Sequence, residues 1–80
     1  DINIEQITIS KDSLLDGKML NDIYQGKNHN ILLVGIHDKE LKKQFIFITE
    51  GHNHKLDHGD ILVVIGESEN IKRYKEEFNL

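Results

Sequence analysis

Three short, nearly uninterrupted apolar segments constrain the fold of this 80-residue chain more than any other feature. They span residues 31–36 (ILLVGI), 45–48 (FIFI) and 61–65 (ILVVI), and polar residues bound each of them. The chain also contains twelve isoleucines, whose β-branched side chains favour strands over helices. Each segment therefore predicts a strand, and the continuous apolar runs predict strands that are buried on both faces.

The first third of the chain predicts a further strand and a helix. Isoleucines alternate over residues 2–9 with an interruption at Glu5 and Gln6, which predicts one strand with a bulge. A helical stripe follows, and we expect this helix to begin near Asp16 and to end near Gly26. The stripe is formed by Leu15, Met19 and Ile23.

The rest of the chain predicts a hairpin and a final helix. The charged residues 38–43 form a turn between the strands at 31–36 and 45–48, and the polar connection 51–59 contains a short strand around Leu56. After the break at Gly66, a second helical stripe consists of Ile71, Tyr74 and Phe78. The predicted order is β-α-β-β-β-α: one α+β domain over residues 1–80, with three to four strands and two helices.

Composition narrows the function classes. The net charge of −4 and the scattered basic residues argue against nucleic acid as a partner, and no apolar run is long enough for direct membrane insertion. The sequence has no nucleophile motif and no phosphate-binding loop, which argues against an enzyme. A domain of this size is only marginally stable alone, and without cysteines we expect it to gain stability as a homodimer.

Three segments together resemble the C-terminal RCK domain, also called TrkA-C, of bacterial potassium channels and transporters. Residues 13–20 (SLLDGKML) are similar to the family's S-x-L-x-G-K-x-L opening, and residues 31–36 fall at its central strand. Residues 56–66 (LDHGDILVVIG) match its pattern L-x-x-G-D-x-L-x-V-x-G. In that pattern we expect Gly59 to adopt positive φ and Asp60 to accept backbone N–H bonds.

The resemblance implies a cytoplasmic regulatory, ligand-sensing and dimerisation domain. Its parent would be a potassium channel or transporter that holds it at the inner face of the cell membrane and assembles it into a larger ring. Ligand binding at the cleft between two subunits would bias gating of the attached pore. No cofactor is required; in some members the ligand is cyclic di-AMP, and another small regulatory ligand remains open, as do the transported ion and the type of transporter. The candidate ligand-binding residues are Asn30, Ile31, Leu32 and His37.

The sequence departs from the family pattern in two places. His37 and Asp38 stand where the family usually has arginine or lysine, and residues 51–54 (GHNH) replace a stretch that often contains prolines. The chain has five histidines, three of which lie in one segment, and this leads to an alternative, a metal-sensing module, because imidazoles bind zinc, nickel and copper. Its candidate ligands are His52, His54 and His58. A third alternative is a purely structural dimerisation domain.

Overall fold

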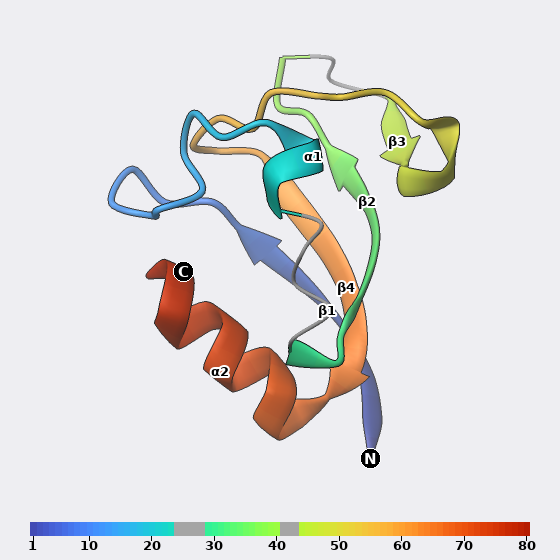
Figure 1. Ribbon diagram of the computed structural model, residues 1–80, viewed down its shortest axis with the longest axis vertical. Helices are drawn as coiled ribbons and strands as arrows, with labels where there is room; N and C mark the ends of the chain where they lie inside the picture. Colours follow the sequence, from blue (N-terminus) through green and yellow to red (C-terminus); the bar gives the residue numbers. More distant parts are fainter. Residues whose placement is uncertain (24–28, 41–43) are drawn as a thin grey trace.

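The computed structural model describes residues 1–23, 29–40 and 44–80, and its elements follow the predicted order (Figure 1). Four antiparallel strands form one sheet in the spatial order β1-β4-β2-β3. The strands are β1 (Ile2–Thr8), β2 (Leu32–His37), β3 (Phe45–Phe47) and β4 (Ile61–Glu67). The helices are α1 (Leu20–Ile23), the short 3₁₀ helix η2 (Ile48–Glu50) and α2 (Ser68–Phe78). The predicted α+β class, with four strands and two α-helices, is confirmed.

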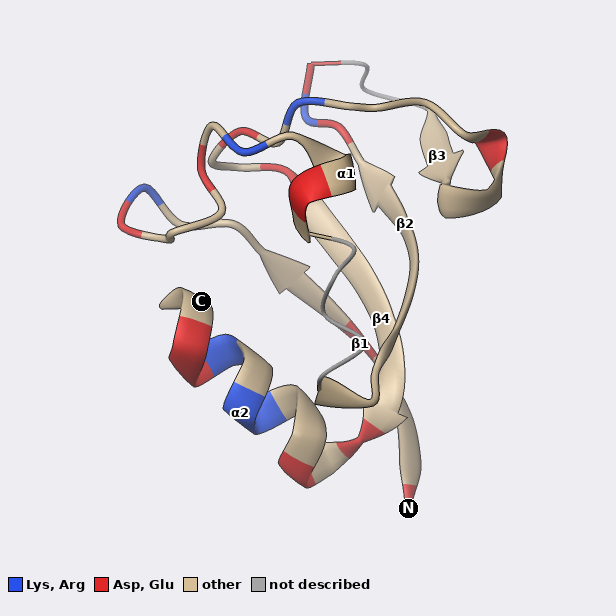
Figure 2. Cartoon of the chain, in the orientation of Figure 1, with Lys and Arg blue, Asp and Glu red and all other residues tan. Residues whose placement is uncertain are grey.

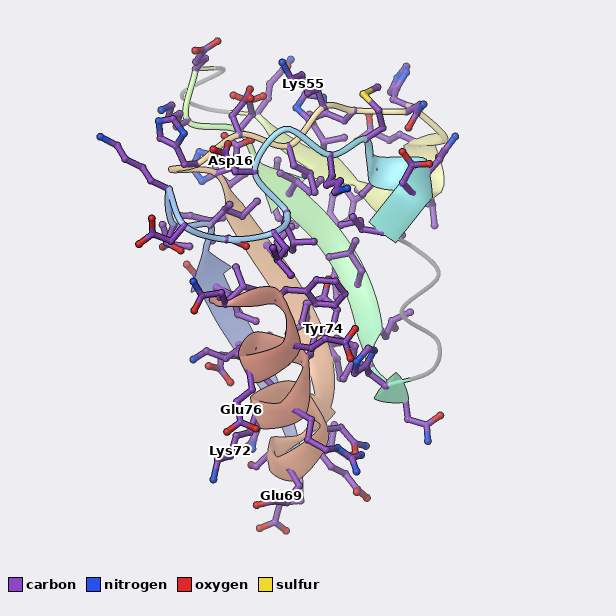
Figure 3. The ribbon with its side chains drawn as sticks, turned by 60° about the vertical axis from the view of Figure 1, so that its left-hand side comes forward. Asp16, Lys55, Glu69, Lys72, Tyr74 and Glu76 are labelled. Atoms are coloured by element: carbon purple, nitrogen blue, oxygen red, sulfur yellow. The ribbon has the colours of Figure 1, made fainter. Side chains whose placement is uncertain are left out.

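Helix α2 covers one face of the sheet (Figure 1). Ile71 and Tyr74 are buried and Phe78 packs against the same core, so the stripe predicted from the sequence is the face that contacts the sheet. Figure 3 shows Tyr74 directed toward the sheet, whereas Glu69 and Lys72 point into solvent. The apolar spacing of α2 therefore fixes which side of the helix is buried.

The loop before α1 caps the end of α2. The hydroxyl of Ser13 donates to the carbonyl oxygen of Phe78 at 2.7 Å, and the Leu14 N–H donates to the same oxygen at 3.0 Å. The Ser13 hydroxyl oxygen also accepts the Leu15 N–H at 3.1 Å. Because a helix end leaves its last carbonyls without partners in the helix, these bonds anchor the loop to α2.

The strands alternate between a buried and an exposed face, so the predicted burial on both faces is wrong for the single chain. On β4, Leu62 and Val64 are buried, whereas Val63 between them is only half-buried. Within the described residues, no helix covers the second side of the sheet, which we call the open face (Figure 1). Its apolar residues are Ile2, Ile4, Leu32, Phe45, Phe47, Ile61, Val63 and Ile65.

The bulge lies in β2 and not near Glu5, where the sequence predicts it. Strand β1 pairs with β4 over its full length without a shift. In β2 the register with β4 shifts between Leu33 and Gly35. As a consequence Leu32 and His37, which are an odd number of residues apart, both lie on the open face, since both pair with open-face residues of β4.

Strands β2 and β3 form the predicted antiparallel hairpin. Gly35 is required there, because a Cβ atom at this position would clash with the backbone carbonyl oxygen of Ile46 and would lie 2.6 Å from the ring of Phe45. The rings of Phe45 and Phe47 meet edge to face, with centroids 4.8 Å apart. Part of the predicted turn, residues 41–43, and the predicted helix end at Gly26 lie outside the described residues.

Helix α1 begins at Leu20 and not near Asp16, because the residues between them pair with another segment. Gly17 has φ +85°, and its N–H donates to the carbonyl of Leu56 at 2.7 Å. The Leu56 N–H in turn donates to the carbonyl of Lys18 at 2.8 Å. The short strand predicted around Leu56 is thus present as an isolated antiparallel bridge to the segment before α1.

Candidate functional site

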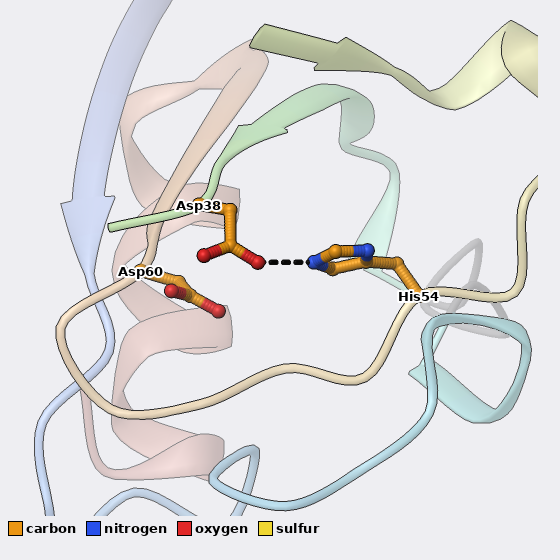
Figure 4. A group of neighbouring side chains, drawn as sticks. All are labelled: Asp38, His54 and Asp60. Carbon is orange, nitrogen blue, oxygen red and sulfur yellow. Dashed lines mark hydrogen bonds and ion pairs between the residues drawn. The ribbon is translucent and has the colours of Figure 1, made fainter. Parts of the chain in front are cut away.

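Three polar side chains converge where β2 ends and β4 begins (Figure 4). The Nε2 atom of His54 lies 2.6 Å from Oδ2 of Asp38, and one ligand atom each of Asp38, His54 and Asp60 lies within 4.8 Å of the others. Asp38 is 8% exposed and Asp60 is fully buried, whereas His54 is half-buried. We call these residues the Asp-His-Asp group.

Backbone N–H groups hold both carboxylates of the Asp-His-Asp group in place. Oδ1 of Asp60 accepts the Lys39 N–H at 3.1 Å, and its Oδ2 accepts the Asp57 N–H at 2.9 Å. Oδ1 of Asp38 accepts the Glu40 N–H at 2.8 Å. The role predicted for Asp60 from the L-x-x-G-D pattern is therefore confirmed, and charged oxygens bonded in this way are strongly oriented.

His54 is positioned by the first residues of α1. Its carbonyl accepts the Leu20 N–H at 2.7 Å, and the side chain of Asn53 accepts the Asn21 N–H at 3.0 Å. On the other side of the site, Gly59 has φ +93°, as the sequence predicts, and turns the chain into β4. The site is thus assembled from segments far apart in the sequence.

The three histidines predicted as a metal-binding set have separate environments. His54 pairs with Asp38, whereas the Nδ1 atom of His58 lies 3.2 Å from Oδ2 of Asp16. His52 is exposed. In the part of the chain that the structure describes, His54 is the one member of this set that belongs to a group of side chains able to share a metal ion, together with Asp38 and Asp60.

A hydrogen bond to the backbone lowers the pKa of Asp16. The backbone N–H of His58 donates to Oδ1 of Asp16 at 2.8 Å, and this bond is the largest cause of the lowered pKa. Partial desolvation opposes the effect, and the side chain of His58 adds to it. The ionised Asp16 carboxylate therefore helps to hold the turn before α1 against the turn before β4.

The four predicted ligand-binding residues occupy two ends of β2. Asn30 is exposed with φ +54°, and Ile31 packs so closely on β4 that a Cβ atom at Gly66 would lie 2.9 Å from its Cγ2 atom. Leu32 is 53% exposed at the start of β2, whereas His37 lies at its end. Five residue steps along a strand span about 16 Å, so these residues do not line one pocket within a single chain.

The sequence did not reveal Asp38 and Asp60 as partners of His54. Asp60 belongs to the L-x-x-G-D pattern, but no motif joins it to Asp38, which lies 22 positions earlier (60 − 38), so only the sheet register brings the two together. One signal was present: the two departures from the family pattern, at residues 37–38 and 51–54, meet in the contact between Asp38 and His54.

The open face is the second candidate site. Ile2 and Ile4 are 66% and 72% exposed, and Phe47 is 53% exposed. Figure 2 shows that the charged residues gather on α2 and in the loops, and the sequences of β2 and β3 contain none. An uncovered apolar surface across four strands is typical of an interaction site.

The chain is similar to a known domain family over almost its whole length. A family model described as the TrkA-C domain matches residues 4–79, which extends the resemblance found by motif to almost every residue. No curated protein matches the chain. Of the helices in residues 1–23, 29–40 and 44–80, none has the length and apolar character needed to cross a membrane.

Proposed function

Because the chain belongs to the TrkA-C domain family, whose members are regulatory domains of potassium transport proteins, we propose that it senses a small ligand in the cytoplasm. It passes the signal to the potassium channel or transporter of which it is a part, at the inner face of the membrane. The single observation that carries this proposal is the uncovered apolar face of the sheet.

Two copies of the domain pair through their open faces. Large apolar side chains on β1, β2 and β3 are more than half exposed in the single chain, and removing them from water provides the driving force. Among the described residues of this face, the one acidic side chain is that of Glu67, which lies at the margin. Repulsion between like charges therefore does not oppose contact between two copies at the centre of the face. In the full parent, such pairs form part of a larger ring.

The ligand binds between the two paired domains. Leu32 and His37 lie on the open face, and Asn30 and Ile31 lead into β2 beside it. Apolar flanks with a few amide or imidazole groups suit a nucleobase. In a two-fold pair each residue occurs twice, so a symmetric ligand such as cyclic di-AMP meets the same groups on both sides.

Regulation requires that the ligand prefer one arrangement of the pair. A ligand that binds two arrangements equally well shifts nothing, however tightly it binds. A change in the relative orientation of two domains alters the distance between the chains attached to them, and this biases the gate. A purely structural dimerisation domain would pair in the same way and bind no ligand.

Titration with cyclic di-AMP by calorimetry tests this proposal. Asn30→Gly is the informative variant, because glycine removes the amide yet tolerates the φ of +54°, which alanine would not. The matched control is Asn79→Gly, since Asn79 also has positive φ, at the end of α2. The wild type and the control should bind one dinucleotide per two chains, and Asn30→Gly should bind at least tenfold more weakly.

Two results would count against the proposal. Absence of binding to the wild type removes this ligand, and paired chains without any ligand would favour the structural alternative. Equal affinity of Asn30→Gly and Asn79→Gly would move the binding site away from the start of β2.

A further inference from the structure

The Asp-His-Asp group has the donor atoms and the spacing of a metal centre (Figure 4). It offers one imidazole nitrogen and two carboxylate oxygens, all within 4.8 Å of one another. Two ligand atoms of a tetrahedral zinc ion lie about 3.4 Å apart, given bond lengths near 2.1 Å. We propose that Asp38, His54 and Asp60 bind one divalent transition-metal ion of the zinc type, with water as the remaining ligand.

The chemistry of the donors selects the class of ion. Imidazole nitrogen is a ligand that zinc, nickel, copper and iron prefer, whereas magnesium and calcium take oxygen ligands and need six or more of them. The group supplies three protein ligands, of which one is nitrogen. Zinc sites with three protein ligands and one water are common, so the group suits zinc better than magnesium or calcium.

The burial of the two acidic side chains also favours a dication at this place. The side chains of Asp38 and Asp60 are buried next to each other. Coulomb attraction between a divalent cation and two neighbouring carboxylates is stronger in a buried, low-dielectric site than in water.

The ligands are held in place from outside the group. The three backbone N–H groups of Lys39, Glu40 and Asp57 bond the carboxylates of Asp38 and Asp60. A carboxylate oxygen has two lone pairs, so an oxygen that accepts one N–H bond can also coordinate an ion. Binding must widen the 2.6 Å contact between His54 and Asp38 by less than 1 Å, which a small rotation of the imidazole achieves.

The bound ion would join the end of β2, the start of β4 and the connection between η2 and β4. Metal binding therefore stabilises the folded chain, because the unfolded chain does not hold these ligands together. The proposal depends neither on pairing through the open face nor on a nucleotide ligand, so each can fail without the other.

Calorimetric titration of the chelator-treated chain with zinc chloride tests the proposal. We expect one zinc ion per chain and a rise in the melting temperature, with no comparable response to magnesium or calcium. His54→Ala and Asp38→Asn should weaken zinc binding at least tenfold. The control is His52→Ala, which removes an exposed imidazole two residues away and should bind as the wild type does.

Nitrogen NMR of the histidine rings gives a second test that needs no substitution. Stoichiometric zinc should shift the Nε2 resonance of His54 and leave His52 and His58 unchanged. The proposal is overturned if the wild type binds no zinc, or if zinc shifts the other two histidines and not His54. Retention of wild-type affinity by His54→Ala would overturn it equally.

Discussion

The backbone N–H of His58 donates a 2.8 Å hydrogen bond to Oδ1 of Asp16, which fastens the turn before α1 to the turn before β4. This hydrogen bond is strongest when the carboxylate is ionised, and for this reason the pKa of Asp16 lies below its ordinary value of 3.8. A carboxyl whose pKa is lowered by folding stabilises the fold above its ordinary pKa and loses that contribution as the pH falls through the lowered value.

Asp16→Asn should therefore make stability less sensitive to acid. At neutral pH the variant should unfold at lower urea concentration than the wild type, and the difference should shrink as the pH is lowered below about 4. Urea unfolding at several pH values measures this. Asp12→Asn, which removes an exposed carboxylate from the same loop, serves as the control. Parallel curves for Asp16→Asn and the wild type at every pH would contradict the assignment.

Tyr74 makes the fold sensitive to alkali. Burial, with a smaller contribution from the charge of Glu77, raises the pKa of Tyr74 from 10.0 to about 12. The contribution of Tyr74 to stability is then complete below pH 10 and is lost as the pH rises from 10 to 12, because the unfolded chain releases the tyrosine proton more easily. A shift of this size corresponds to about 3 kcal/mol of unfolding free energy.

Tyr74→Phe should remove this loss. We expect the wild type to lose more stability than the variant between pH 9 and pH 11.5, and urea unfolding at both pH values measures the difference. If both proteins lose the same amount, the hydroxyl of Tyr74 ionises in the folded chain as easily as in water.

Ser13→Ala tests the contact between the loop before α1 and the end of α2. The substitution removes the 2.7 Å bond to the carbonyl of Phe78 and leaves the N–H of Leu15 without its acceptor. We expect a loss of roughly 1–3 kcal/mol in unfolding free energy. Ser10→Ala is the matched control, because the hydroxyl of Ser10 bonds the carbonyl of Asn79 at an exposed position. Equal losses in the two variants would mean that burial at Ser13 adds nothing.

Val64→Asp should unfold the domain. Val64 is 1% exposed on the covered face of β4, and an unpaired buried carboxylate costs several kcal/mol. A domain of this length has a total stability of about 4–12 kcal/mol. The adjacent variant Val63→Asp places the same charge on the open face and should remain folded. Circular dichroism and thermal melting distinguish them, and similar melting of both variants would contradict the assignment of faces.

The sequence predicts correctly those helices and strands whose apolar spacing reflects a single buried face. The stripe of α2 and the hairpin of β2 and β3 follow from apolar spacing and turn residues, because both are local properties. The predicted start of α1 was wrong because Gly17 and Lys18 form backbone hydrogen bonds with Leu56. This contact joins distant segments, and no local sequence pattern indicates it.

The prediction that the strands are buried on both faces was wrong for the single chain, because a continuous apolar run does not show whether anything covers the second face of the strand. The run at 61–65 is apolar throughout, yet α2 covers only one face of β4. The residues of the Asp-His-Asp group were likewise predicted only in part. The sequence identified His54 and the family identified Asp60, but the sheet register was needed to join them with Asp38.

Pairing through the open face is tested most directly by sedimentation equilibrium of three proteins at micromolar concentration. The wild type should have twice the chain mass. Ile4→Asp, at a position in β1 that is 72% exposed, should be a folded monomer, since the substitution would place an unpaired charge in the apolar contact. Leu14→Asp alters an equally apolar residue, 60% exposed beside the end of α2, and should stay paired. A monomeric wild type, or an Ile4→Asp variant that pairs as strongly as the wild type, would contradict the account.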